Sequence, residues 1–214
     1  MPLATPLQVL AAHGVRLKVL AQVFPVLRHE VVGPLSNATL AAAMLRQTPE
    51  GADASALQQR CQRLAGDMTG MLEDSVNVVR DLDQWLTDKG ALAPADALLR
   101  ECRKLMFSHL LLSRRSVTWP DEIAAIDLPQ FTTRYLLLAW LLCLLPALPE
   151  DADVTLDFSQ ADIWHACFSA PPDFAVGQQV AFDPQEVELL AAESGWHLER
   201  HTHRWSLRLP APAP

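Results

Sequence analysis

One short segment combines the residue types that phosphoryl chemistry needs. Residues 27–37 read LRHEVVGPLSN, so that His29 lies between Arg28 and Glu30. A neutral imidazole is a nucleophile, and a carboxylate that accepts one ring N–H fixes the tautomer and strengthens the other nitrogen. A guanidinium attracts phosphoryl oxygens. The segment therefore predicts His29 as a phosphoryl acceptor with Glu30 beside it, whereas the alternative is an ordinary surface histidine.

The element that carries His29 is a predicted helix over residues 6–47. Apolar residues recur in it every seven positions, with partners three positions later, which is the a/d pattern of a bundle or coiled-coil helix. The pattern consists of Leu10, Leu17, Phe24 and Val31, with Leu20 and Leu27. His29 takes position f, which points away from the seam. Pro25 and Pro34 each remove a backbone hydrogen bond and are expected to bend the helix.

A second heptad helix is predicted over residues 54–89, after a turn-like segment and before Gly90, a typical helix terminator. Its two apolar rows are Leu57, Leu64, Met71 and Val78, and Cys61, Met68, Ser75 and Leu82. Two such helices form a hairpin, and a lone hairpin leaves apolar surface uncovered. Residues 1–89 are therefore predicted to pair with a second copy as a dimeric four-helix bundle.

The outer face of the first helix is predicted to bind a partner. Beyond His29 it carries small or apolar residues, which suit docking by an apolar helix. The predicted contact residues are Arg28, Val32, Gly33, Pro34, Ser36, Leu40 and Ala43.

Residues 90–214 alternate between helical and strand patterns. Helices are predicted over 95–112, 132–145 and 184–194, and strands over 116–119, 154–158, 163–169, 196–201 and 204–209. This order indicates helices packed on one face of a small sheet, an α+β domain. The whole chain is thus predicted as α+β with domains at 1–89 and 90–214.

Composition excludes several functions. The formal charge is −8 and the longest basic run is Arg114–Arg115, so nucleic-acid binding is not expected. The apolar run at 135–145 is about half the roughly 20 residues that span a bilayer, so it predicts a buried helix and no membrane contact. The start lacks signal-peptide features, which predicts a cytoplasmic protein. The four separated cysteines predict buried free thiols, and His197, His201 and His203 lack the neighbours of a metal site.

The segment around His29 resembles the H-box of the two-component histidine-kinase superfamily, with a histidine, an adjacent acidic residue and a proline five positions later. His29, Glu30 and Pro34 match, and Gly33 departs from the usual polar residue that aligns water for dephosphorylation. The resemblance implies that residues 1–89 form a dimerisation and phosphotransfer hairpin. Residues 91–210 resemble, by pattern, the ATP-binding domain of the same kinases, an α/β sandwich.

The resemblance also identifies what the second domain lacks. In the family, one helix presents asparagines to the nucleotide phosphates and Mg²⁺, but the matching residues here are Ala139 and Cys143, which are not Mg²⁺ ligands. The glycine-rich loops are replaced by SAPPDF and by a segment with Gly177 alone. The domain is therefore predicted to be degenerate and to bind neither ATP nor another cofactor.

These features together resemble the dimeric, kinase-like histidine phosphotransferases (ChpT-type). The implied function is transfer of a phosphoryl group between receiver aspartates of response regulators, or from a hybrid histidine kinase, through His29. Mg²⁺ would belong to the receiver. Two alternatives stay open: a non-enzymatic pseudokinase-like adaptor or inhibitor, and an active histidine kinase with a divergent nucleotide site.

Overall fold

The chain divides into two units whose boundary falls inside its first helix. The structure, a computed structural model, describes residues 6–47, 53–113, 116–174 and 182–209. One unit, called here the helical unit, is Phe24–Thr87, and the other, the sheet unit, is Met1–Val23 with Asp88–Pro214. The sequence placed residues 1–89 in one domain, whereas the structure groups the first 23 residues with the C-terminal part.

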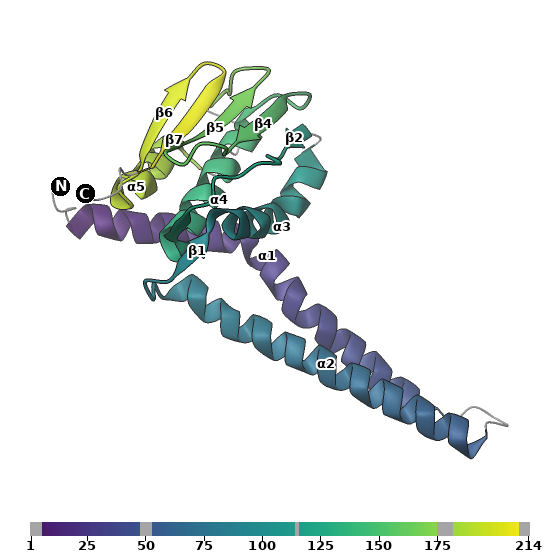
Figure 1. Ribbon diagram of the computed structural model, residues 1–214. Coiled ribbons are helices and arrows are strands. Elements are labelled where there is room, and N and C mark those ends of the chain that lie inside the picture. Colours follow the sequence, from purple (N-terminus) through teal and green to yellow (C-terminus); the bar gives the residue numbers. More distant parts are fainter. Residues whose placement is uncertain (1–5, 48–52, 114–115, 175–181, 210–214) are drawn as a thin grey trace. The chain divides into compact units, whose positions relative to one another are not determined.

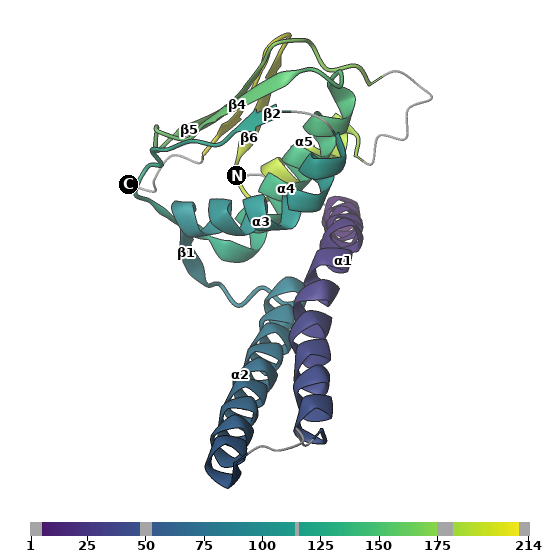
Figure 2. The same cartoon turned by 90° about the vertical axis from the view of Figure 1, so that its right-hand side faces the viewer.

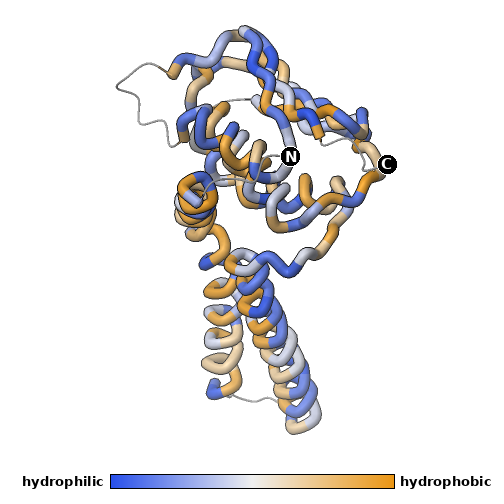
Figure 3. Tube along the Cα trace, turned by 90° about the vertical axis from the view of Figure 1, so that its left-hand side faces the viewer, coloured by the Kyte–Doolittle hydropathy of each residue, from blue (hydrophilic) through white to orange (hydrophobic). Residues whose placement is uncertain are grey.

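Two long helices, α1 (Pro6–Leu45) and α2 (Ala54–Leu86), account for the N-terminal part of the chain (Figure 1). Both predicted rows of α2 are buried or half-buried, which confirms its heptad pattern. Trp85 and Ser75 are fully buried, and Ser75 Oγ donates to the carbonyl of Met71 at 2.9 Å. Figure 3 shows the two helices by hydropathy: α1 is mainly apolar, and α2 carries more polar residues.

The end of α2 differs from the prediction. The helix stops at Leu86, and its C-cap is Thr87, which precedes Gly90 by three residues. Gly90 nevertheless has a positive φ of 66°, a conformation that glycine adopts without steric cost. Its N–H donates to Asp88 Oδ1 at 2.9 Å, so this glycine shapes the connection after the helix and does not terminate it.

The buried residues of α1 agree with the predicted heptad rows in the second half of the helix and depart from them in the first. In the second half, Leu27, Ala38 and Ala41 are buried, and they continue the predicted a/d rows. In the first half the predicted Leu10 and Leu17 are each 68% exposed in the single chain, so the expected burial is not observed there. The buried stripe consists instead of Ala12, Val15, Val19 and Val23. This stripe continues into Leu27 at four-residue spacing, so one α-helical face is buried along α1, and in the first half it differs from the predicted a/d row.

The sheet unit contains one mixed sheet covered by helices on one face (Figure 2). Its strand order is β2-β4-β5-β7-β6, with β2 and β4 parallel and the other pairs antiparallel. The strands are β2 (Ser116–Thr118), β4 (Asp153–Asp157), β5 (Ile163–Phe168), β6 (His197–His201) and β7 (Arg204–Arg208). The covering helices are α3 (Ala95–Ser113), α4 (Gln130–Ala147) and α5 (Pro184–Glu193). The predicted α+β architecture is confirmed.

A second, two-stranded sheet was not predicted. Strands β1 (Leu92–Pro94) and β3 (Asp127–Pro129) pair antiparallel and bracket the start of α3 and of α4. Each has three residues, too few for an alternating pattern to show in the sequence.

Helix α4 is the centre of the sheet unit. Its residues from Thr133 to Leu145 are all buried, as expected for a helix that is apolar on every side. On its sheet side, Trp140 stacks on Phe158 at 6.3 Å between ring centroids, and Phe158 stacks on Trp164 at 4.5 Å. Arg134, also buried, pairs with Glu101 of α3 at 3.0 Å. The core therefore joins α4 to the sheet by aromatic contacts and to α3 by an ion pair.

Two helices have the length and apolar composition of a membrane span, α1 and α4. The apolar window of α4 is 78% buried inside the protein, and that of α1 is 28% buried. Burial of α4 is what a core helix of a folded domain shows, and α1 carries Arg16 and Lys18, whose ion pairs lie within the sheet unit.

Phe158 supplies the test of this core. Phe158→Ala removes the ring between Trp140 and Trp164, and we expect it to lower the free energy of unfolding by about 3–5 kcal/mol. The matched control is Phe107→Ala, because Phe107 is exposed on α3 and its loss should change stability by less than about 0.5 kcal/mol. Urea unfolding monitored by tryptophan fluorescence measures both. Equal stability of the two variants would contradict the assigned core.

Candidate functional site

His29 lies on the surface of α1 in the helical unit. Its side chain is exposed and makes no hydrogen bond or ion pair with any residue that the structure describes. Consecutive helix residues point in directions about 100° apart, so Glu30 does not face the imidazole. The expected His29–Glu30 hydrogen bond is therefore absent from the described part of the chain. The imidazole is open to a partner and is not held in one tautomer by its neighbour.

A continuous exposed stripe follows His29 along the helix, and we call it the His29 strip. It consists of His29, Val32, Ser36, Leu40 and Ala43. Val32 is 50% exposed and Leu40 is 61% exposed, which is high for apolar side chains without a partner. Arg28 is also exposed, beside the strip. The structure therefore places these predicted contact residues on one accessible surface.

Gly33 and Pro34 are half-buried at the edge of this surface. A Cβ added to Gly33 would meet no atom within 4 Å, so this position needs no glycine for steric reasons. Sequence reasoning missed two further exposed apolar residues of the same helix half, Leu35 and Met44. A heptad description places both near the seam, where burial is expected in the single chain.

The positions that the resemblance matched to nucleotide ligands lie inside the protein. Ala139 and Cys143 of α4 have no exposed surface. Burial raises the pKa of the Cys143 thiol to about 12, helped by the carboxylates of Asp183 and Glu186 and opposed by Arg200 and Lys18. Lys18 belongs to α1, so the first half of α1 lies near this part of α4. Both positions of α4 are therefore covered by protein.

The segment after β5 is tied back to α4. The N–H of Asp173 donates to the carbonyl of Ala147, at the end of α4, with an N–O distance of 2.7 Å. This hydrogen bond satisfies a carbonyl that the helix end leaves without a partner. The second predicted loop, with Gly177, lies outside the described residues.

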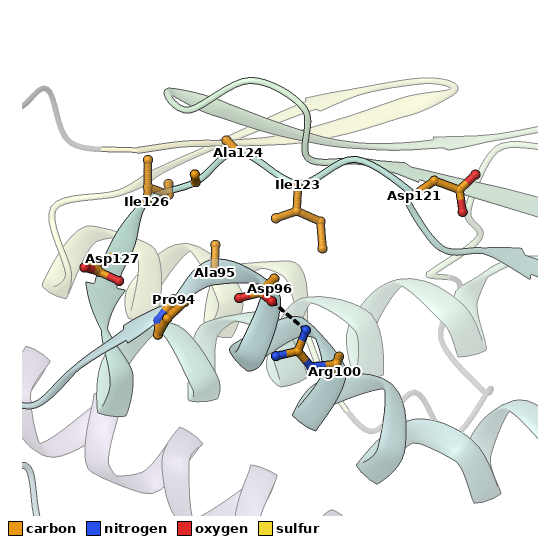
Figure 4. A pocket seen from close by; sticks show the side chains of 10 residues that line it. Pro94, Ala95, Asp96, Arg100, Asp121, Ile123, Ala124, Ile126 and Asp127 are labelled. Atoms are coloured by element: carbon orange, nitrogen blue, oxygen red, sulfur yellow. Dashed lines mark hydrogen bonds and ion pairs between the residues drawn. The ribbon is translucent and has the colours of Figure 1, made fainter.

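The described residues of the sheet unit form an open cavity of about 590 Å³ at the start of α3 (Figure 4). Asp96 and Arg100 form an ion pair at its wall, and Ile123 and Ile126 line the opposite side. It contains none of the residues predicted for function.

The sheet also aligns a serine, a histidine and an aspartate that are distant in sequence. His165 Nδ1 lies 2.8 Å from Ser206 Oγ, and Asp157 is the cross-strand neighbour of His165. However, Ser206 is buried, and the Asp157 carboxylate accepts hydrogen bonds from Ser159. A catalytic triad needs an accessible nucleophile and a carboxylate directed at the histidine, so this row is structural.

Comparison with known proteins yields likenesses of structure alone. No protein-family model matches the sequence, and no curated protein matches it. Among solved structures, the cytoplasmic segment of histidine kinase QseC is 14% identical, with a TM-score of 0.44 over 63% of this chain and 93% of that chain. A histidine kinase from Burkholderia phymatum is 16% identical, with a TM-score of 0.40 over 96% of this chain and 97% of that one.

A third similar structure is histidine kinase ThkA in complex with the response regulator TrrA. It is 12% identical and has a TM-score of 0.40 over 97% of this chain and 67% of that chain. All three TM-scores are below 0.5, so these likenesses assign neither family nor function. The functional assignment rests on the residues themselves.

The cysteines provide a test of how the protein covers α4. All four are free, as predicted, but only Cys102 and Cys143 are buried, whereas Cys61 is half-buried and Cys167 is exposed. Burial also raises the pKa of Cys102. Because a thiolate is the reactive form, a pKa raised by burial keeps both thiols unreactive at neutral pH. Labelling with a thiol reagent should modify Cys167 first and Cys102 and Cys143 only after unfolding, and fast labelling of Cys143 in the native protein would contradict the covered face.

Proposed function

We propose that this protein is a histidine phosphotransfer protein of a two-component phosphorelay. It accepts a phosphoryl group on His29 from the aspartate of one response-regulator receiver, or of a hybrid histidine kinase, and passes it to another receiver. The observation that supports this most is an exposed imidazole at the start of an accessible, largely apolar helix strip. The proposed site of action is the cytoplasm.

The reaction requires little from this chain. The lone pair of one ring nitrogen of His29 forms an N–P bond, the P–O bond to the receiver aspartate breaks, and the carboxylate leaves with the electron pair. Positioning and electrostatic stabilisation provide most of the catalysis of phosphoryl transfer. We assign Mg²⁺ to the receiver, Arg28 to the phosphoryl oxygens, and Glu30 to proton exchange with the imidazole once a partner orders the site.

The protein is proposed to act as a homodimer. Helix α2 leaves a second apolar stripe exposed in the single chain, beside the rows that pack inside the hairpin. This stripe consists of Leu72, Val76, Val79 and Leu86. A four-helix bundle covers such a stripe by pairing two hairpins.

We further propose that the protein binds no ATP. The support is the complete burial of Ala139 and Cys143, together with the lack of hard oxygen ligands at both positions. The exposed but unoriented His29 also fits the adaptor alternative, in which the His29 strip binds a regulator without receiving phosphate. A divergent active kinase would need nucleotide contacts from residues other than Ala139 and Cys143.

His29→Ala tests the proposed acceptor. We expect complete loss of label uptake from a phosphorylated receiver and a stability change within about 0.5 kcal/mol, because the side chain is exposed. Glu30→Ala should slow uptake by about 10²–10⁴-fold, the usual contribution of a general base. His13→Ala is the matched control, as His13 is an exposed histidine of the same helix. Equal uptake by wild type and His29→Ala would contradict the assignment, and no uptake from a broad receiver panel would favour the adaptor.

The dimer is tested on the exposed stripe of α2. Leu72→Glu with Val79→Glu should leave the hairpin folded and yield monomers, because both side chains are exposed in the single chain and would place charges in the proposed interface. Val32→Glu is the control: it should keep the dimer and weaken receiver binding. Analytical ultracentrifugation measures the oligomeric state of each variant, alone and mixed with the receiver. A wild-type monomer at micromolar concentration would refute the proposed bundle.

Absence of nucleotide binding is tested by calorimetry. Titration with Mg-ATP at millimolar concentration should give no heat of binding, since the relevant face of α4 is covered. A micromolar dissociation constant would instead support the divergent kinase.

A further inference from the structure

The first half of α1 is attached to the sheet unit by charged side chains as well as apolar ones. Arg16 is only 7% exposed, and its guanidinium pairs with Glu193 at the end of α5. The same guanidinium lies 5.2 Å from the ring centroid of Phe131 at the start of α4. Its Nε is buried and has no hydrogen-bond partner among the described residues. The contact therefore buries a charged group whose hydrogen bonds are incomplete.

Lys18 makes a second, parallel attachment. Its Nζ donates to both carboxylate oxygens of Glu186, at 2.7 and 2.8 Å, and lies 4.9 Å from the ring centroid of Phe182. Glu186 has a second role, because it also accepts the N–H of Asp183 in the capping box that begins α5. Residues 16 and 18 of α1 are therefore bound at opposite ends of α5.

A third contact lies where the helix changes units. Pro25 has no N–H, so the carbonyl of Ala21, four residues earlier, lacks its helical hydrogen bond, and the Gln22 carbonyl follows it. His109 Nε2 of α3 lies 3.4 Å from the carbonyl oxygen of Gln22, to which it donates. His29 follows Gln22 by seven residues in the same helix.

We propose that Arg16 and Lys18 are positioning residues for the phosphoryl transfer: they make the first half of α1 a fixed part of the sheet unit and so anchor the helix that presents His29. The positioning role, unlike the attachment itself, rests on the proposed function. The attachment gives the sheet unit a role that needs no nucleotide. Losing one partner of a buried ion pair is strongly destabilising. Such a pair therefore suits a permanent attachment better than a transient one.

The ion pair between Arg16 and Glu193 allows a charge swap. Arg16→Glu places two carboxylates together, Glu193→Arg places two guanidinium groups together, and the double variant restores opposite charges with good helix formers at both sites. Glu193 ends α5, where a positive charge is favourable. Glu186 is unsuitable for a swap because it also caps α5. Arg63→Glu, an exposed change of the same charge on α2, is the matched control.

The first measurement is hydrogen exchange of the full-length protein, read by mass spectrometry. Arg16→Glu should speed exchange of the amides of residues 9–22 by about tenfold or more, since loss of the pair promotes local opening. The swapped variant should return exchange to within about threefold of wild type, and Arg63→Glu should not change it. Lys18→Met, which removes a partly exposed ammonium and keeps the helix, is a milder second variant should Arg16→Glu fail to fold. Unchanged exchange in both variants would overturn the attachment.

The second measurement is label uptake from a phosphorylated receiver. Arg16→Glu should lower kcat by about threefold or more at unchanged KM, because the His29 strip that binds the receiver is intact while its anchoring is lost. The swap should restore kcat. Faster exchange with unchanged kcat would overturn the positioning role. If the wild type itself takes up no label, the proposed function fails and the positioning role fails with it, while the exchange data still decide whether the attachment exists.

Discussion

The structure depends on one helix that must pack in two environments. Helix α1 runs without interruption from Pro6 to Leu45, yet its first half buries the Ala12–Val23 stripe in the sheet unit and its second half buries Leu27, Ala38 and Ala41 beside α2. Val19, Val23 and Leu27 follow one another at four-residue spacing, and Ala38 follows Leu27 by eleven residues, so the buried positions of both halves share one helix face. Pro25, where a backbone hydrogen bond is missing, lies between the two halves. His29 lies shortly after this boundary.

The packing of the sheet unit is determined by helix α4. A helix as apolar as α4 has to be covered on every side, and among the described residues α3, α5, β3, the sheet and the first half of α1 all contact it. Covering α4 closes the positions that the resemblance associates with nucleotide. The same packing attaches the first half of α1 to the sheet unit and supports the proposal that this unit binds no Mg-ATP. Phosphoryl transfer between an aspartate and an exposed imidazole needs no such nucleotide site.

The sequence predicted most elements and the exposed position of His29, because long periodic segments bury consistent faces. It missed β1 and β3, which are too short to show a period, and placed the end of α2 at Gly90, although Thr87 already leaves the helix. It also predicted burial of Leu10 and Leu17, since a heptad repeat does not reveal which of two apolar faces a tertiary neighbour will select. The ion pairs of Arg16 and Lys18 join residues more than 160 positions apart, and no local pattern signals them.

The most direct test of the account is to map the phosphoryl group itself. The full-length protein, incubated with a phosphorylated receiver and without nucleotide, would be digested under neutral conditions that preserve phosphoramidates and analysed by fragment mass spectrometry. The account predicts one phosphoryl group per chain, on the imidazole of His29, and none after incubation with Mg-ATP alone. A phosphoryl group on another residue, or labelling by ATP without the receiver, would contradict it.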